Sequence, residues 1–273
     1  MALILTFKQP PIDLSFPSEY DFEQIDDLTY KMVSKVNEEP ITSINKRAFA
    51  SCKTLESVVI PDSVKTIGYS AFYCHTSLKS VVIPNSVKTI DDFAFYNCKS
   101  LKSIIIPNSV NIIGYSAFYR CTSLKSVIIP DSVKTVGNSA FFNCKSLESV
   151  VIPDSVNTIG ECAFSYCVSL ESVVIGNLVN TIGVRAFNHC VSLESVIIPD
   201  SVNIIGDYTF NGCTSLESVV IPDSIITIQK NVFSNCPSLK IITINGLLTE
   251  YLKKYFETNY PEIDLEYDDY LLK

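Results

Sequence analysis

The chain has 273 residues, of which 47% are hydrophobic and 18% are charged, and its formal net charge is −8. This charge argues against a protein that binds nucleic-acid phosphates, and two histidines without a tryptophan leave little material for acid–base or metal chemistry. No apolar run approaches the ~18 residues of a membrane span, so we expect no membrane insertion. The segment from Met1 to Lys8 has neither a basic start nor the long apolar stretch of a signal peptide, which favours a soluble, acidic protein.

The first 40 residues do not share the periodicity that follows them. Leu3 to Phe7 is predicted to form a strand. Ser18 to Asp21 has the pattern of a helix capping box, which predicts a helix that runs to about Glu38. We interpret residues 1–40 as an N-terminal cap (strand plus helix), because a stack of repeats needs a polar cover over its first unit. An independent recognition element is the alternative.

The central part of the chain, residues 41–245, repeats with a strict period of 23 residues. Nine copies follow one another without insertion or deletion, and phenylalanine, leucine, proline and cysteine each keep one position of the repeat. In one copy, Ser57 to Ile60 alternates as a short strand, and Pro61-Asp62 ends it in a turn. Gly68 is expected to permit a second tight corner, and Ala71-Phe72 to start a short helical or 3₁₀ turn.

Each such coil leaves an apolar edge that only the next coil can bury, so the copies must stack. The predicted fold is a repeat solenoid, a leucine-rich-repeat-like stack of about nine 23-residue coils. We expect short parallel strands, short helical or 3₁₀ turns, and a cap at each end. With strands about 4.8 Å apart, the stack would be on the order of 40 Å long.

Eight of the ten cysteines fall at one position of successive coils, and His75 takes the remaining place. Such a column predicts small buried side chains, because parallel Cα–Cβ bonds do not suit a disulfide and a straight file cannot surround a metal ion. We therefore expect unpaired thiols, which fit a reducing compartment, and no metal site. Cys74 lies outside the column beside His75, and it is the best candidate for a reactive thiol.

Residues 246–273 are interpreted as a C-terminal cap, since Asn245-Gly246 closes the last coil. Leu247 to Phe256 predicts a short amphipathic helix. The acidic residues from Glu257 onward predict a solvated tail rather than a docking motif.

The motifs Ile-Pro-x-Ser-Val-x-x-Ile-Gly and Ala-Phe-x-x-Cys-x-Ser-Leu resemble the leucine-rich repeat family, specifically its BspA-like branch. The match covers about three quarters of the chain and recurs in every copy. The resemblance implies a non-enzymatic surface that recognises a protein or a glycan, in a family often described as cell-surface proteins or adhesins. It points to a cell or particle surface, whereas the missing signal peptide and the unpaired thiols point to the cytoplasm, so the localisation is left open.

Three outward columns are candidate partner-binding surfaces. The first is the strand face, where a serine column runs beside a β-branched column that would form a contiguous apolar stripe. Strand stabilisation by β-branched residues is the alternative. The columns continue to Ser218 and Val220, and the residues assigned to a partner are Ser57, Val59, Ser80, Val82, Ser103, Ile105, Ser126, Ile128, Val151 and Val174.

The second column is charged and changes sign along the chain. Lysine occupies it in the early coils and glutamate in the later ones, namely Lys79, Lys102, Lys125, Glu148, Glu171, Glu194 and Glu217. Segregation costs self-repulsion and creates a bipolar field, which favours an oriented partner or head-to-tail self-association. Recent duplication of neighbouring coils would produce the same pattern.

The third column is aromatic in the early coils only, at Tyr73, Tyr96, Tyr119 and Phe142. Rings on an exposed corner could bind a peptide or a sugar, because tyrosine offers a large contact area at low entropy cost. Packing against the N-terminal cap and stacking of the rings on one another are the alternatives. The Asp/Asn column after the prolines is assigned to turn bonding rather than to calcium.

No catalytic residue, cofactor or metal ligand is assigned, because the serines are periodic and have no histidine partner. The leading hypothesis is a non-enzymatic binding protein that engages a protein or glycan through its strand face and N-terminal corner. The second is an intracellular scaffold or structural protein that self-associates along the rod axis. The third, least favoured, is a cysteine-dependent enzyme that uses Cys74 and His75. No nucleic-acid partner is expected.

Overall fold

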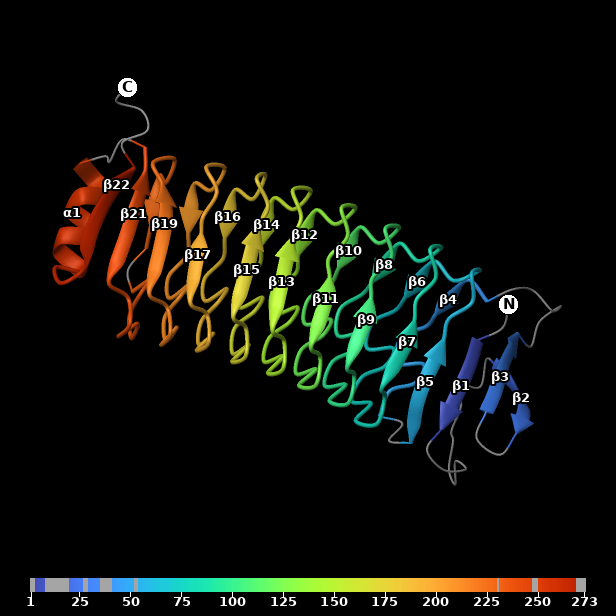
Figure 1. Ribbon diagram of the computed structural model, residues 1–273. Helices are drawn as coiled ribbons and strands as arrows, with labels where there is room; N and C mark the ends of the chain where they lie inside the picture. Colours follow the sequence, from blue (N-terminus) through green and yellow to red (C-terminus); the bar gives the residue numbers. More distant parts are fainter. Residues whose placement is uncertain are drawn as a thin grey trace.

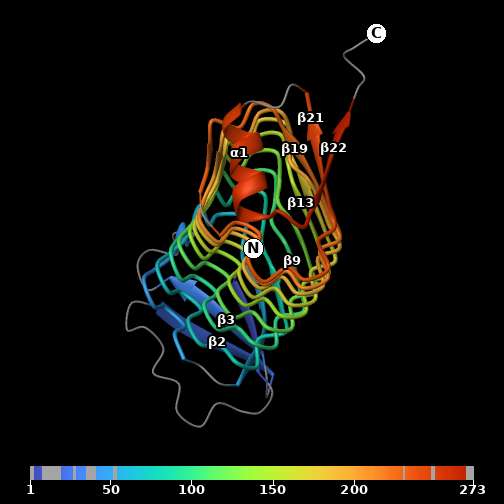
Figure 2. The ribbon, with the colours of Figure 1, turned by 90° about the vertical axis from the view of Figure 1, so that its left-hand side faces the viewer.

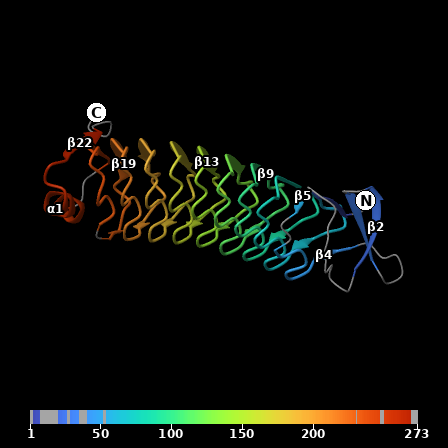
Figure 3. The same ribbon diagram turned by 90° about the horizontal axis from the view of Figure 1, so that it is seen from below.

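The computed structural model describes residues 3–7, 20–26, 29–34, 41–51, 54–229, 231–246 and 250–268. The chain winds into a long stack of coils, with the N-terminal strands at one end and helix α1 (Glu250–Asn259) at the other (Figure 1). The same elongated form is seen from below in Figure 3. The predicted solenoid of about nine coils with a 23-residue repeat is confirmed.

One side of each coil is a short strand of what we call the strand face. Its strands are β5 (Leu55–Val59), β7 (Ser80–Val82), β9 (Ser103–Ile105), β11 (Ser126–Ile128), β13 (Ser149–Ile152), β15 (Ser172–Ile175), β17 (Ser195–Ile197), β19 (Ser218–Pro222) and β21 (Ile241–Asn245). Neighbouring strands are parallel, and Ser126 pairs with both Ser103 and Ser149. This constant shift puts equivalent residues of successive coils side by side.

The other side of the coils carries a second parallel sheet, built from nine two-residue strands. They are β4 (Ser43–Ile44), β6 (Thr66–Ile67), β8 (Thr89–Ile90), β10 (Ile112–Ile113), β12 (Thr135–Val136), β14 (Thr158–Ile159), β16 (Thr181–Ile182), β18 (Ile204–Ile205) and β20 (Thr227–Ile228). Figure 2 looks along the stack and shows strands β9, β13 and β19 on one side of the flattened coils. The two sheets enclose the core between them.

The core consists of files of identical side chains. Successive rings from Phe49 to Phe233 stack nearly parallel, with centroids 5.2 to 5.7 Å apart. The predicted inward orientation of Val58 and Ile60 is confirmed, since they are 1% and 2% exposed. Every coil therefore buries its apolar residues against the same residues of its neighbours, and this packing requires coils of equal length.

The cysteine column is buried as predicted from Cys98 to Cys213, whereas Cys236 is partly exposed, and the thiols also form hydrogen bonds. All the described cysteines are unpaired, while Cys52 lies outside the described residues. From Cys98 to Cys236, each Sγ of the column donates to a phenylalanine carbonyl of an adjoining coil, at 3.1 to 3.3 Å. In the His75 coil, Nε2 donates to the Phe49 carbonyl in the same way. Most of these carbonyls also accept from a backbone N–H, as the Phe118 carbonyl does from Cys121 N, so each thiol adds a second hydrogen bond that joins adjacent coils.

The third side of each coil is a run of turns, and between residues 41 and 246 the described chain forms no helix. The expected helical or 3₁₀ turn is replaced because two residues per coil, such as Ser70 and Cys74, have positive φ angles of 53° and 60°. This geometry directs backbone N–H groups at the next coil. The N–H of Ser70 donates to the Asp92 backbone carbonyl, and the N–H of Phe72 donates to that of Ala94. Left-handed residues cost about 1–2 kcal/mol each, and these inter-coil bonds offset that cost.

Gly68 is required for a different reason from the one the sequence indicates. It is absent from the positive-φ glycines, so the corner does not depend on a left-handed conformation. A Cβ atom at this position would instead lie 2.6 Å from the Ile44 carbonyl oxygen of the preceding coil. Glycine is therefore favoured here by the close approach of two backbones.

At the N-terminal end, strand β1 (Leu3–Phe7) is confirmed and the predicted helix is wrong. Residues in its range form β2 (Tyr20–Asp26) and β3 (Thr29–Ser34), an antiparallel pair. Strand β1 pairs with both β3 and β5. Tertiary pairing overrides local helix propensity here, because the first coil of the stack would otherwise present an open sheet edge. The segment boundaries at residues 40 and 245 stay a prediction.

At the C-terminal end, helix α1 falls close to its predicted position, with Leu252 and Phe256 fully buried. The acidic side chains of the tail are exposed as predicted from Glu257 to Glu266, but the sequence did not predict that part of the tail forms a strand. Strand β22 (Asp264–Asp268) pairs in parallel with β21 and extends the strand face. Strand β22 is the edge of its sheet. Its acidic side chains suit an edge strand, because charged side chains there discourage the pairing of a further strand.

The fold predicts a large difference between two adjacent aromatic residues. Phe141→Ala removes a fully buried ring from the middle of the file, and we expect a loss of about 3–5 kcal/mol in the free energy of unfolding. Phe142→Ala removes a half-buried ring and should cost about 1–2 kcal/mol. Urea denaturation followed by circular dichroism measures both, and equal losses would contradict the central role of the inner file.

Candidate partner-binding surface

The strand face presents an exposed ladder of valine and isoleucine side chains. Six members on adjacent coils are 56 to 75% exposed, namely Val82, Ile105, Ile128, Val151, Val174 and Ile197. We call these six residues the apolar ladder. They point outward because alternate side chains of a strand lie on opposite faces, and the neighbouring residues fill the core. The ladder ends where Val59 and Val220 become partly buried.

The predicted serines flank this ladder on the same face. Ser80, Ser103 and Ser126 are exposed, whereas Ser57 and Ser218 at the two ends are partly buried. Serine is much smaller than valine or isoleucine, so the apolar ladder stands above its polar border. A partner that lies across the strands would therefore meet the ladder first.

The charged column forms one continuous line, which we call the charge file. Its lysines and glutamates are joined by backbone hydrogen bonds between successive coils, for example from Lys125 N to the Lys102 carbonyl and from Glu171 N to the Glu148 carbonyl. The file begins with Glu56, which the sequence prediction omitted although it lies in the same repeat position. Glu56 Oε1 accepts from Lys79 Nζ at 2.8 Å.

The change of sign along the charge file leaves most of its members facing like charges. At the junction, Lys125 Nζ lies 3.5 Å from Glu148 Oε1. Within the described ranges, Lys102, Glu171, Glu194 and Glu217 form no ion pair. Like charges on coils about 4.8 Å apart repel by about 1 kcal/mol in water before screening by salt. A partner with the opposite order of charges would relieve this repulsion.

The aromatic column is a stack of rings that pack on one another. Tyr73, Tyr96, Tyr119 and Phe142 follow with centroids 4.8, 4.7 and 4.6 Å apart and nearly parallel planes. All four are partly buried, and burial raises the pKa of Tyr73 and of Tyr96. The inner ring faces are occupied by neighbouring rings, so a sugar or peptide could not stack on them.

Beyond Phe142 the same column becomes polar and is held by side-chain hydrogen bonds. Asn188 Nδ2 donates to Ser165 Oγ at 3.2 Å, and Asn211 Nδ2 donates to Asn188 Oδ1 at 2.7 Å. These groups are buried, so the bonds satisfy them inside the structure. The column therefore changes from ring stacking to amide bonding, and neither half requires a ligand to explain it.

A hollow that the repeat pattern did not predict lies on the strand face between β15 and β17. This cavity of about 430 Å³ is lined by Val174, Ile197, Asn177 and Asp200, among others. In this coil Gly176 replaces the repeated proline, and Leu178, which is 63% exposed, replaces a serine. The equivalent serine of the next coil donates to the Val179 carbonyl. These two departures from the repeat are the features of the sequence that could have indicated the hollow.

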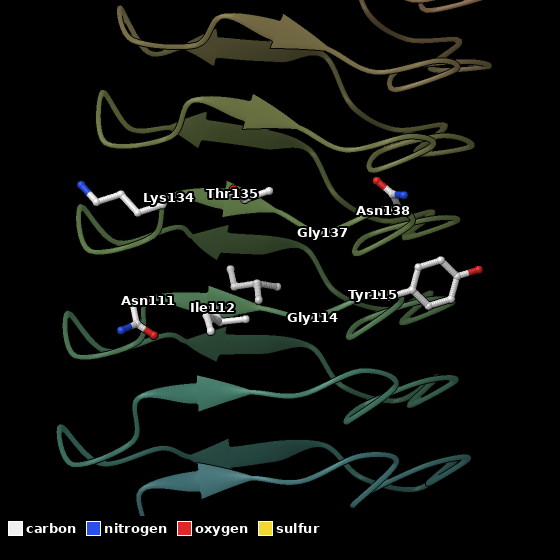
Figure 4. A pocket seen from close by; sticks show the side chains of 9 residues that line it. Asn111, Ile112, Gly114, Tyr115, Lys134, Thr135, Gly137 and Asn138 are labelled. Atoms are coloured by element: carbon white, nitrogen blue, oxygen red, sulfur yellow. The ribbon is translucent and has the colours of Figure 1, made fainter.

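A second hollow lies on the other sheet, between strands β10 and β12. This cavity of about 490 Å³ is lined by Ile112, Tyr115, Lys134 and Asn138, whose side chains are shown in Figure 4. Ile112 is exposed because it stands in the outward threonine position of its strand. The cavity has an apolar floor and polar rims, but the figure shows its labelled side chains spread apart rather than converging on one point.

Cys74 and His75, the residues of the cysteine-dependent enzyme hypothesis, lie in separate structural contacts. The His75 ring is fully buried and its Nε2 donates to the Phe49 carbonyl, whereas Asn97 Nδ2 donates to Cys74 Sγ at 3.4 Å. Each side chain thus has a structural partner in a neighbouring coil. In the described part of the chain, no three His, Cys, Asp or Glu residues are grouped to hold a metal ion. None of its helices is long and apolar enough to cross a bilayer.

These features define a class of protein, a parallel β-solenoid with a leucine-rich-repeat pattern and an exposed strand face. The chain matches the family described as "BspA type Leucine rich repeat region (6 copies)" over residues 19–148 and 134–262. It belongs to the BspA-type leucine-rich repeat family. The predicted resemblance is therefore confirmed, and proteins built from such repeats are generally non-enzymatic.

Several solved structures of bacterial leucine-rich repeat proteins are similar to this chain. A leucine-rich repeat protein from Bacteroides ovatus is 28% identical with a TM-score of 0.64, over 91% of this chain and 67% of that protein. A leucine-rich cell surface protein from Faecalibacterium prausnitzii is 29% identical with a TM-score of 0.52, over 77% of this chain and 64% of that protein. The leucine-rich repeat protein of T. pallidum is 27% identical with a TM-score of 0.56, over 73% and 89%. No curated protein matches the chain.

The burial of the thiols predicts a selective reaction with alkylating reagents. Burial raises the pKa of Cys167 to about 12, and it raises the pKa of Cys144 and Cys190 as well. Thiolate is the reacting form and is scarce at pH 8 in such sites. Among the described cysteines, we expect iodoacetamide to modify Cys74 fastest in the folded chain, and the partly exposed Cys162 and Cys236 more slowly, because burial raises the pKa of Cys162 and raises that of Cys236 to about 11.

Peptide mapping by mass spectrometry measures this pattern, with urea-unfolded chain as the control in which every thiol reacts. Modification of the buried column at the rate of Cys74 would contradict the structure. A rate at Cys74 far above that of an exposed model thiol would instead revive the enzyme hypothesis.

Proposed function

We propose that the chain is a non-enzymatic binding protein whose partner is another protein, held on the strand face. The observation that carries this proposal is the apolar ladder, six adjacent Val and Ile residues that are 56 to 75% exposed. The largest apolar patches of ordinary monomers cover roughly 300–600 Å² and are often functional. A contiguous ladder of this length on a regular surface is costly to leave in water, and a partner would bury it.

The structure favours a protein over a glycan as the partner. Glycan binding would depend on open aromatic faces, and the Tyr73–Tyr96–Tyr119 rings are stacked on one another. The strand face offers Val and Ile side chains bordered by serines and charges, which is the composition of a protein contact with an apolar centre and polar rim. The N-terminal corner is accordingly left out of the proposed site.

We further propose an adhesin-type role at a cell or particle surface, and the name of one similar protein supports the surface placement. The similar protein from Faecalibacterium prausnitzii is named a cell surface protein. A rigid rod with one repetitive face suits such a role, because the coils position all contact residues before the partner arrives. Cell fractionation, together with protease treatment of intact cells, tests separately whether the protein lies on the cell surface.

The binding proposal is tested by two matched triple variants used in quantitative affinity capture. Ile105→Ser/Ile128→Ser/Val151→Ser removes the middle of the apolar ladder. Ile112→Ser/Ile204→Ser/Ile226→Ser removes three exposed isoleucines that lie off the strand face. We expect the first variant to lose at least about tenfold in capture of specific protein partners, because central apolar contacts dominate interfaces.

The second variant should retain capture to within about twofold, which also controls for general surface polarity. Thermal melts establish that both variants are folded. Unchanged capture by the strand-face variant, or equal losses in both, would rule out the strand face as the binding surface.

A further inference from the structure

Between Lys79 and Glu194, the charge file is complementary to its own reverse, and only the flanking Glu56 and Glu217 would face each other as like charges. Read from Lys79 it carries three lysines and then three glutamates, with a fourth glutamate beyond them. A second copy that runs in the opposite direction would place each lysine opposite a glutamate. The matched residues would be Lys125 with Glu148, Lys102 with Glu171, and Lys79 with Glu194.

The apolar ladder has the same midpoint as the charge file. Its six members divide into three on each side of the boundary between β11 and β13. In the reversed arrangement, each contact joins one isoleucine to one valine, namely Ile128 with Val151, Ile105 with Val174, and Ile197 with Val82. The combined side-chain volume is therefore constant along the contact, which suits close packing of two regular faces.

The hydrogen bonding of the strand face shares this midpoint. Its strands fall into separate groups, and the middle group is the four-stranded sheet β9-β11-β13-β15. The discontinuities, between β7 and β9 and between β15 and β17, lie at equal distances from the centre in strand order. The hollow of about 430 Å³ beside Val174 and Ile197 would then face Val82 and Ile105 of the other copy.

We propose that the strand face binds a second copy of this chain in an antiparallel, two-fold symmetric dimer. The two-fold axis runs parallel to the strands and passes between β11 and β13. Rotation about this axis reverses the rod, turns the faces toward each other and keeps both charge files on the same side of the ladder. Rotation about the rod axis would instead put the two charge files on opposite sides, where no lysine meets a glutamate.

The expected contact is large enough for a specific dimer. Such interfaces bury on the order of 800 Å² per partner. Six Val and Ile residues more than half exposed, together with their serine and charged borders, provide an area of that order. This arrangement differs from head-to-tail association along the rod axis, since β1 to β3 and α1 occupy the two ends of the stack (Figure 1).

This inference rests on the proposed function, because it uses the same face, and charge-reversal variants test its register. Lys102→Glu and Glu171→Lys each replace two attractive contacts of the dimer by two repulsive ones. A 1:1 mixture of the two variants restores both contacts in a heterodimer. Lys134→Glu, on the opposite sheet, is the matched control.

Sedimentation velocity across about 1–500 μM measures the dissociation constants. We expect each single variant to weaken the dimer at least about tenfold, the equimolar mixture to return to within about threefold of the original chain, and the control to remain unchanged. Raising the salt concentration should reduce these differences. Ile128→Ser, close to the axis, should also abolish the dimer, whereas Ile112→Ser should not.

A chain that stays monomeric at the highest concentration overturns the inference, as does a dimer that the mixture fails to restore. If the monomeric chain still captures other proteins through its apolar ladder, the proposed function stands and only the second copy is excluded as the partner. If capture fails too, both proposals fall together.

Discussion

The structure depends on the exact equivalence of successive coils, enforced by hydrogen bonds on every side of the coil. Parallel pairing joins the strand face, the second sheet repeats it, and the positive-φ turns add N–H groups aimed at the next coil, such as Phe72 N on the Ala94 carbonyl. The stacked phenylalanine rings can face one another only if each coil has the same number of residues. An inserted residue that did not loop out at a turn would shift the later side chains out of their files.

Because the inner files fix the register, the outer files are fixed as well. A repeat protein is therefore forced to display any outward repeat as a straight line on its surface. That constraint explains how modest changes between coils, valine to isoleucine or lysine to glutamate, produce an extended apolar ladder and a bipolar charge file. A partner on the strand face therefore contacts residues that share one position of the repeat. The distance between these residues is the spacing of neighbouring strands.

The two ends obey a different rule from the middle. A middle coil finds its hydrogen-bonding partners in its neighbours, whereas a terminal coil would leave an edge open. The chain covers those edges with β1 and the β2–β3 pair at the start, and with α1 and β22 at the finish. Inside the stack, the buried Sγ atoms add further hydrogen bonds between adjacent coils, such as the one from Cys144 Sγ to the Phe118 carbonyl.

The sequence by itself determined the period, the number of coils, the inward phenylalanine and leucine files and the outward side of residues such as Ile105, because these follow from spacing alone. Tertiary structure decided the rest. Residues 20–26 and 29–34 became strands because β1 and the first coil supplied partners, and Asp264–Asp268 joined the strand face because β21 offered an edge. The Tyr73–Tyr96 stacking and the hollow beside Val174 likewise depend on distances between coils. Local sequence carries side-chain preference, but a hydrogen bond between distant segments is available only after the stack has formed.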